Sequence, residues 1–190
     1  MSGDLARLLN ALGLIAIALL LLLAFIDQLW FGELPCPLCI LQRMAFIAAG
    51  FGLALNLIFG SKPSHYGLMI LGATAGAAIA LRQIVLHIVP GTGAYGEPIL
   101  GLHLYTWSFV FFALIIIGSA LMLLGDRQFA RVEPLPKRLK PLPLFALSLF
   151  LALVVGNVIS TLALCGLGNC PDEPQGYLLL QDYFGSNITP

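Results

Sequence analysis

Five long apolar segments constrain the fold of this 190-residue chain more than any other feature. They cover residues 8–27, 38–59, 66–88, 104–124 and 142–164, give or take a few residues. Each is long enough to cross a bilayer, which takes about 20 apolar residues. Lipid offers no hydrogen-bond partners to the backbone, and the segments are too long for barrel strands, so each is predicted to be a helix. The sequence therefore predicts an all-α integral membrane protein.

Composition supports this prediction, because 59% of the residues are hydrophobic and only 9% are charged. The first segment has a second interpretation, a cleaved signal peptide. Its apolar stretch is longer than the usual range of about 7–15 residues, and no small-x-small cleavage site follows that stretch before Trp30, so a retained span is favoured. We expect a transmembrane helical domain over 1–164 and an extramembrane tail over 165–190.

The basic residues predict the orientation. With five spans, one side receives Arg7, Lys62, Arg127, Arg131, Lys137, Arg138 and Lys140. The other side receives Glu33, Glu97, Asp172, Glu173 and Asp182. By the positive-inside rule the basic side is cytoplasmic, so the N-terminus is expected inside and the tail outside. The basic loop after the fourth segment is explained by orientation and contact with lipid headgroups, which we favour over nucleic-acid binding.

All four cysteines fall on the predicted outer side. Cys36 and Cys39 precede or begin the second segment, and Cys165 and Cys170 follow the fifth. In a bacterial cell this side is oxidising, so disulfide chemistry is expected there. Four cysteines allow three pairings. We favour the two local pairs, because each closes a very small loop.

The stretch "LPCPLCILQR" carries the most specific chemistry. Prolines flank Cys36, and proline is frequent at the first position of a helix, so the pair is expected in the first turn of the second helix. The helix dipole favours a thiolate there. Arg43 follows Cys39 by four residues and can share its face; an arginine within the membrane indicates a functional site. The alternative is a static disulfide with a snorkelling arginine, but so small a loop removes little entropy from the unfolded chain.

The segment "CPLCILQR" resembles the C-x-L-C-x-x-Q-R signature of the DsbB family of bacterial inner-membrane disulfide-forming proteins, through Cys36, Leu38, Cys39, Gln42 and Arg43. The resemblance extends more weakly over the first four spans. It implies a four-helix bundle that binds ubiquinone or menaquinone beside the first pair. It also implies that the pair oxidises a periplasmic DsbA-like thioredoxin-fold partner and passes two electrons to the quinone, with Arg43 and Gln42 at the quinone site.

The second cysteine pair departs from this pattern. The family usually carries it between the third and fourth helices, whereas Cys165 and Cys170 follow an additional fifth span. This resembles the five-span branch of the family, sometimes called DsbI. Two roles stay open for Cys165 and Cys170: a structural staple of the tail, or a shuttle that relays electrons to Cys36 and Cys39. Gly166 and Gly168 favour a segment that can reorganise between dithiol and disulfide.

The third segment carries further candidates near its outer end. His87 can donate to a quinone carbonyl or can be solvated at the interface, and Arg82 can meet a partner or the site or can snorkel; Gln83 lies between them. Gly72 and Gly76 form a small-xxx-small pattern that predicts close helix packing.

Three other classes of protein share features with this sequence. A zinc site could use the four cysteines, although they would have to converge from two helix ends. A disulfide-stapled membrane scaffold needs no redox turnover. The vitamin K epoxide reductase class is also quinone-linked, but its C-x-x-C lies near the last core helix and lacks the Gln-Arg that follows here. The sequence favours a quinone-dependent protein-dithiol oxidase that requires no metal.

Overall fold

The computed structural model describes residues 3–89, 91, 98–129, 140–168, 170–171 and 174–180. These residues form the long helices α1 (Gly3–Trp30), α2 (Pro37–Phe59), α3 (Pro63–Leu86), α4 (Leu104–Leu123) and α5 (Pro141–Cys165), and the short 3-10 helix η1 (Asp126–Gln128). Each long helix is long and apolar enough to cross a membrane. Within the described part of the chain there is no strand. The predicted all-α membrane fold is therefore confirmed.

The helix boundaries follow from recognisable residues. Proline lies in the first turn of α2, α3 and α5, where its missing N–H costs no hydrogen bond. Gly60 ends α2 at φ 80° and Gly166 ends α5 at φ 62°, a backbone conformation that glycine adopts without strain. The first helix extends beyond the predicted 8–27 at both ends, because a helix can continue past its apolar run through residues of good helix propensity such as Arg7 and Gln28.

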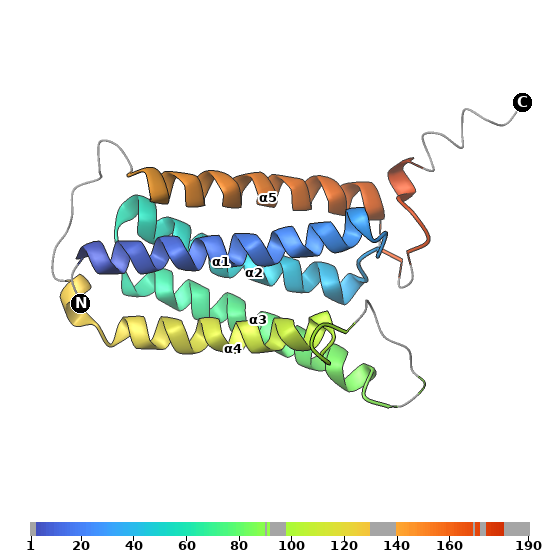
Figure 1. Cartoon of the computed structure of the whole chain (residues 1–190), viewed down its shortest axis with the longest axis horizontal. Coiled ribbons are helices and arrows are strands. Elements are labelled where there is room, and N and C mark those ends of the chain that lie inside the picture. Colours follow the sequence, from blue (N-terminus) through green and yellow to red (C-terminus); the bar gives the residue numbers. More distant parts are fainter. Residues whose placement is uncertain are drawn as a thin grey trace, which may run out of the picture.

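Helix α2 is the central element of the bundle. It contacts α1, α3, α4 and α5, whereas α5 packs chiefly on α1, and α3 packs on α4. Figure 1 shows α5 running along α1 on one side and α3 with α4 on the other. The predicted close packing at Gly72 and Gly76 is confirmed: a Cβ on Gly72 would lie 3.1 Å from the backbone nitrogen of Ala49, and one on Gly76 would overlap the ring of Phe112.

The two ends of the bundle differ in chemistry. Arg7, Lys62, Arg127 and Lys140 lie at one end, which we call the basic end, while Arg131, Lys137 and Arg138 lie outside the described residues. All four cysteines lie at the other end, which we call the cysteine end. Among the described residues, the basic side chains of the N-terminus and the loops are therefore separated from the cysteines as predicted, while Arg43 and Arg82 lie within α2 and α3 near the cysteine end. Glu97, Asp172, Glu173 and Asp182, which were predicted to face the outer side, lie outside the described residues.

A buried polar network joins the elements at the basic end. Asn56 Nδ2 donates to Asn10 Oδ1 at 2.9 Å, and Asn10 Nδ2 contacts the Tyr66 hydroxyl at 2.9 Å. The Tyr66 hydroxyl donates to Gln128 Oε1 at 3.1 Å. Since these residues come from α1, α2, α3 and η1, the network fixes how the helices meet at this end, far from the cysteines.

Candidate active site

Both cysteine pairs form local disulfides at the same end of the bundle. Cys36 is bonded to Cys39 and Cys165 to Cys170, so the predicted pairing is confirmed. Cys36 is the N-cap of α2, and its Sγ accepts a hydrogen bond from the backbone N–H of Cys39 at 3.1 Å. The pair thus occupies the first turn of α2, where unpaired backbone N–H groups favour negative charge on sulfur. Cys36 is buried and Cys39 is half-buried.

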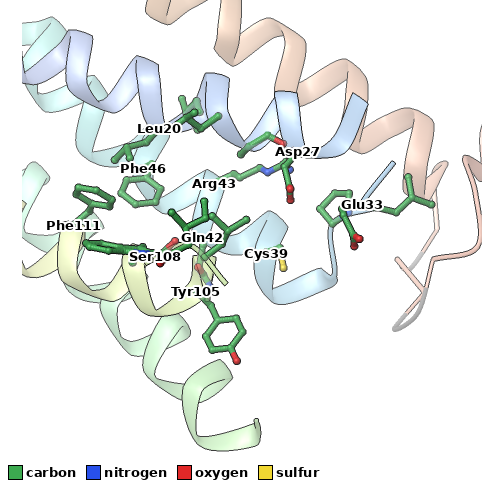
Figure 2. A pocket seen from close by; sticks show the side chains of 18 residues that line it. Leu20, Asp27, Glu33, Cys39, Gln42, Arg43, Phe46, Tyr105, Ser108 and Phe111 are labelled. Carbon is green, nitrogen blue, oxygen red and sulfur yellow. Dashed lines mark hydrogen bonds between the residues drawn. The ribbon is translucent and has the colours of Figure 1, made fainter. Parts of the chain in front are cut away.

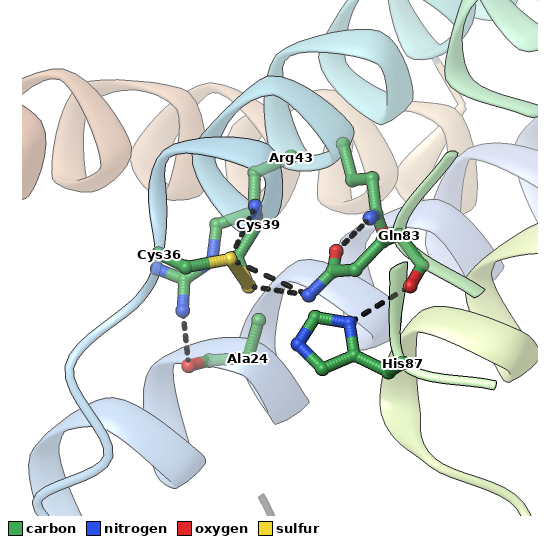
Figure 3. The surroundings of a disulfide bond; sticks show 7 residues. Ala24, Cys36, Cys39, Arg43, Gln83 and His87 are labelled. Atoms are coloured by element: carbon green, nitrogen blue, oxygen red, sulfur yellow. Dashed lines mark hydrogen bonds between the residues drawn. A yellow bond between two sulfur atoms is a disulfide. The ribbon is translucent and has the colours of Figure 1, made fainter. Parts of the chain in front are cut away.

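A buried glutamine contacts both sulfurs of the first pair. Gln83 Nε2 lies 3.4 Å from Cys36 Sγ and 3.5 Å from Cys39 Sγ, and its Oε1 accepts a hydrogen bond from Gln42 Nε2 at 2.6 Å (Figure 3). Sequence reasoning noted Gln83 but assigned it no role. The signal that could have found it is an amide in an otherwise apolar span, where a polar side chain is costly and indicates function.

Arg43 is anchored on α1. Its Nη1 donates to Gln28 Oε1 at 2.7 Å and its Nη2 to the carbonyl oxygen of Ala24 at 2.8 Å, with the guanidinium 5.7 Å from the centre of the Phe25 ring. Two hydrogen bonds and a cation–π contact fix the position of the charge. Gln28 is itself buried, and sequence reasoning did not identify it.

A cavity of about 310 Å³ brings Cys39, Gln42 and Arg43 together. Side chains from α1, α2 and α4 surround it (Figure 2). Its walls are mainly apolar and aromatic. They comprise Leu20, Leu21, Leu23, Ala24, Leu34, Pro35, Phe46, Ile99, Leu104, Tyr105, Trp107 and Phe111, with Asp27, Glu33 and Ser108 among the polar side chains. The cavity is partly open at the surface of the bundle, and Leu23 in its wall is 59% exposed.

The two candidate residues of α3, His87 and Arg82, do not line the cavity. His87 ends α3, and its Nδ1 lies 2.8 Å from the carbonyl oxygen of Gln83. Its ring centre is 5.5 Å from that of Tyr105, which lines the cavity, although His87 itself does not. Arg82 is exposed and is not part of the cavity wall. The structure therefore gathers Gln42 and Arg43 at the cavity, places His87 beside it, and leaves Arg82 on the outer surface of α3.

The second disulfide packs against the first turns of α2. Cys165 is buried with Ile40 and Leu164, and Leu34, Cys170 and Tyr177 cover this small cluster. Ile40 directly follows Cys39, so the second pair packs on the same turn of α2 that carries the first pair. The Tyr177 hydroxyl accepts a hydrogen bond from Gln28 Nε2 at 3.0 Å, which attaches the tail to α1.

The described residues contain no group of three or more metal-binding side chains. In this structure each cysteine sulfur is bonded to another sulfur. The chemistry that this arrangement can perform is thiol–disulfide exchange next to an apolar cavity with a fixed positive charge.

Comparison with known proteins identifies the family. The family model "Disulfide bond formation protein DsbB" matches residues 6–96, which include the first cysteine pair, Gln42, Arg43 and His87 but not the second pair. The chain is 32% identical over 141 residues to disulfide bond formation protein B of Marinobacter nauticus, covering 55% of this chain and 84% of that protein.

Other relatives match over shorter stretches. Disulfide bond formation protein B of Chromohalobacter salexigens is 34% identical over 84 residues, or 42% of this chain and 49% of that protein. The protein of the same name from Nitrosomonas eutropha is 42% identical over 82 residues, which are 41% of this chain and 47% of that protein. No solved structure matches the chain. Given the match to most of the Marinobacter protein and the five membrane-spanning helices, the chain belongs to the DsbB family, as a multi-pass inner-membrane oxidoreductase of disulfide bond formation.

Proposed function

We propose that the protein oxidises the dithiol of a periplasmic DsbA-like thioredoxin-fold partner and passes the electrons to ubiquinone or menaquinone. One observation carries this proposal: Cys39 and Arg43 line the same mainly apolar cavity, which is partly open at the surface of the bundle. A redox-active sulfur, a fixed cation and a route from the bilayer are what electron transfer to a lipid-soluble acceptor requires.

The cavity suits a quinone ring in size and chemistry. At about 310 Å³ it lies at the lower end of the range for small-molecule sites. Phe46, Tyr105 and Trp107 offer aromatic surfaces, and Arg43 offers positive charge. When bound, the quinone accepts two electrons and two protons as the cysteine pair returns to the disulfide.

The cysteines perform the exchange. A thiolate of the second pair, Cys165 and Cys170, once the partner has reduced it, attacks one sulfur of the Cys36–Cys39 disulfide, so that a disulfide forms between the pairs and the other sulfur leaves as a thiolate. The remaining thiol of the second pair then resolves this disulfide and leaves Cys36 and Cys39 reduced. Arg43, held by Gln28 and Ala24, stabilises negative charge that develops in the cavity without having to reorganise. Gln42 lines the cavity beside it.

For the second pair we favour the relay. Cys165 and Cys170 take electrons from the partner and pass them to Cys36 and Cys39; the location of both pairs at one end of the bundle, with Cys165 packed on Ile40 of α2, supports this relay. We assign 1–164 to the membrane domain and 165–190 to a periplasmic tail, with the N-terminus cytoplasmic. Arg7, Lys62, Arg127 and Lys140 at the basic end support this orientation. Alkaline phosphatase fused after residue 190 should be active and a fusion after residue 61 inactive; the reverse pattern contradicts the orientation.

The deciding experiment measures quinone reduction by the purified protein with a reduced thioredoxin-fold donor. We expect no turnover after Cys36→Ser or Cys39→Ser, because the electron path is cut. Turnover that survives these changes refutes the proposal. The double variant Cys165→Ser/Cys170→Ser is expected to lose turnover with the protein donor and to keep it with dithiothreitol. Full activity with the protein donor would assign Cys165 and Cys170 to the structural role.

A further inference from the structure

The first cysteine pair has a donor that neither its helix nor the cavity supplies. Gln83 lies on α3, is fully buried, and directs Nε2 toward Cys36 Sγ at 3.4 Å and Cys39 Sγ at 3.5 Å (Figure 3). A disulfide sulfur is a weak acceptor, so these contacts contribute little while the pair is oxidised. The same buried amide can donate a stronger hydrogen bond when the pair is reduced and one sulfur is a thiolate.

The orientation of the Gln83 amide is fixed by a second amide. Gln42 Nε2 donates to Gln83 Oε1 at 2.6 Å, and Gln42 is 5% exposed. A flipped Gln83 would turn its oxygen toward the sulfurs and its NH₂ group toward the Gln42 donor. Both arrangements are unfavourable for buried groups. The NH₂ group is therefore kept on the sulfurs.

Reduction changes the acceptor that lies next to this NH₂ group from a disulfide sulfur to a thiolate. When a thiolate attacks, one new S–S bond forms, the Cys36–Cys39 bond breaks, and its electron pair stays on the leaving sulfur. A hydrogen bond to a thiolate is charge-assisted and stronger than one to a neutral sulfur. Since Nε2 lies near both sulfurs, it can donate to whichever one leaves.

We propose that Gln83 is a catalytic residue, which donates a hydrogen bond to the thiolate released when the Cys36–Cys39 disulfide opens and so makes the pair more readily reduced. The proposal rests on the dithiol oxidase function proposed above. It also gives Gln42 a role through Gln83, as the residue that orients the amide.

The test is a redox titration that needs neither quinone nor protein partner. Purified protein with Cys165→Ser/Cys170→Ser is equilibrated in glutathione buffers, and the reduced fraction of Cys36 and Cys39 is measured by alkylation and mass shift. In this background Gln83→Leu is expected to lower the equilibrium constant for reduction about tenfold, because the thiolate loses a charge-assisted hydrogen bond. Thiolate absorbance of the reduced protein at fixed pH should fall as well.

Two further variants separate this role from packing. Gln42→Leu leaves Gln83 in place but frees its amide, and should lower the constant in the same direction by about threefold. Asn157→Leu removes a buried amide of α5 that donates to Leu153, and should leave the constant unchanged. An unchanged constant in Gln83→Leu, or an equal fall in Asn157→Leu, overturns the proposal.

If Gln83→Leu does not fold, Gln42→Leu decides, and an unchanged constant there overturns the proposal. A wild-type protein that does not reduce quinone would instead contradict the proposed function, and it would not affect the result of the redox titration. The two failures are thus distinguishable.

Discussion

Arg43 donates a hydrogen bond to Oε1 of Gln28 across the interface of α2 and α1. The other end of the same amide, Nε2, donates to Ser160 Oγ at 2.8 Å and to the Tyr177 hydroxyl at 3.0 Å. One buried side chain therefore connects the cation of the cavity to α5 and to the tail beyond the second disulfide. The fifth helix is part of what holds Arg43 in place.

Replacing Gln28 should impair the site without touching a cysteine. In Gln28→Leu the guanidinium loses a charge-assisted hydrogen bond, and we expect quinone-dependent turnover to fall about tenfold. Steady-state kinetics over a range of quinone concentrations measures the effect. Wild-type kinetics in Gln28→Leu would show that the hydrogen bond from Arg43 to Gln28 is dispensable.

Loss of the hydrogen bond between Tyr177 and Gln28 should lower turnover less than replacement of Gln28 does. Tyr177→Phe removes the hydroxyl that accepts a hydrogen bond from Gln28 Nε2, and it leaves the bond between Gln28 and Arg43 intact. We expect turnover to fall about twofold, less than the full effect of a neutral hydrogen bond, because the bond between Gln28 and Arg43 remains. A loss as large as that of Gln28→Leu would mean that the tail, rather than α1, determines the position of Arg43.

Tryptophan fluorescence should report quinone binding. The chain has two tryptophans; Trp107 lines the cavity, whereas Trp30 is 83% exposed at the end of α1. In Trp30→Phe, addition of a short-chain quinone should quench the remaining emission along a saturable curve. Trp107→Phe provides the control, since its remaining Trp30 should show only linear quenching. Saturable quenching in both variants would place the quinone elsewhere.

Packing of α5 should be sensitive to one glycine. A Cβ on Gly50 of α2 would overlap the ring of Phe150, which is fully buried on α5. Gly50→Ala is therefore expected to lower the free energy of unfolding by about 1–3 kcal/mol, the typical cost of overpacking. Unfolding in detergent measures it. Gly118→Ala, where nothing lies within 4 Å of the new Cβ, is the matched control and should be neutral or slightly stabilising.

The basic-end network should support stability and not chemistry. Asn56→Leu leaves Asn10 Oδ1 and the backbone N–H of Lys62 without their partner. We expect a loss of about 2–4 kcal/mol in the free energy of unfolding. Asn157→Leu, which gives up one local bond, should cost much less. Quinone reduction below the unfolding transition should be unchanged in both variants, and a specific loss of turnover in Asn56→Leu would contradict this division.

The membrane helices and the site of the first cysteine pair could be predicted because their signals are local. An apolar run of the right length specifies a span whatever its neighbours are, and the prolines, cysteines and Arg43 lie within ten residues of one another. The pairing of the disulfides was predictable for the same reason, because each joins cysteines three or five residues apart.

The amides that complete the site could not be placed from the sequence. Gln83 contacts Cys36 across 47 residues of chain, and Gln28 contacts Tyr177 across 149. No spacing within one helix encodes these contacts, which depend on how α1, α3 and α5 pack around α2. Arg82 and Gln83 are neighbours in sequence, yet the helix turns one outward and the other onto the sulfurs.

The location of both disulfides and the cavity at one end has an energetic consequence for the cell. On the proposed reaction, thiol oxidation releases two protons and quinone reduction consumes two at the same face of the membrane. Moving one charge across the bilayer costs about 2.3 kcal/mol per 100 mV, but here no charge needs to cross. Disulfide formation would then neither consume nor generate membrane potential, and turnover in proteoliposomes should be equal with and without an imposed voltage.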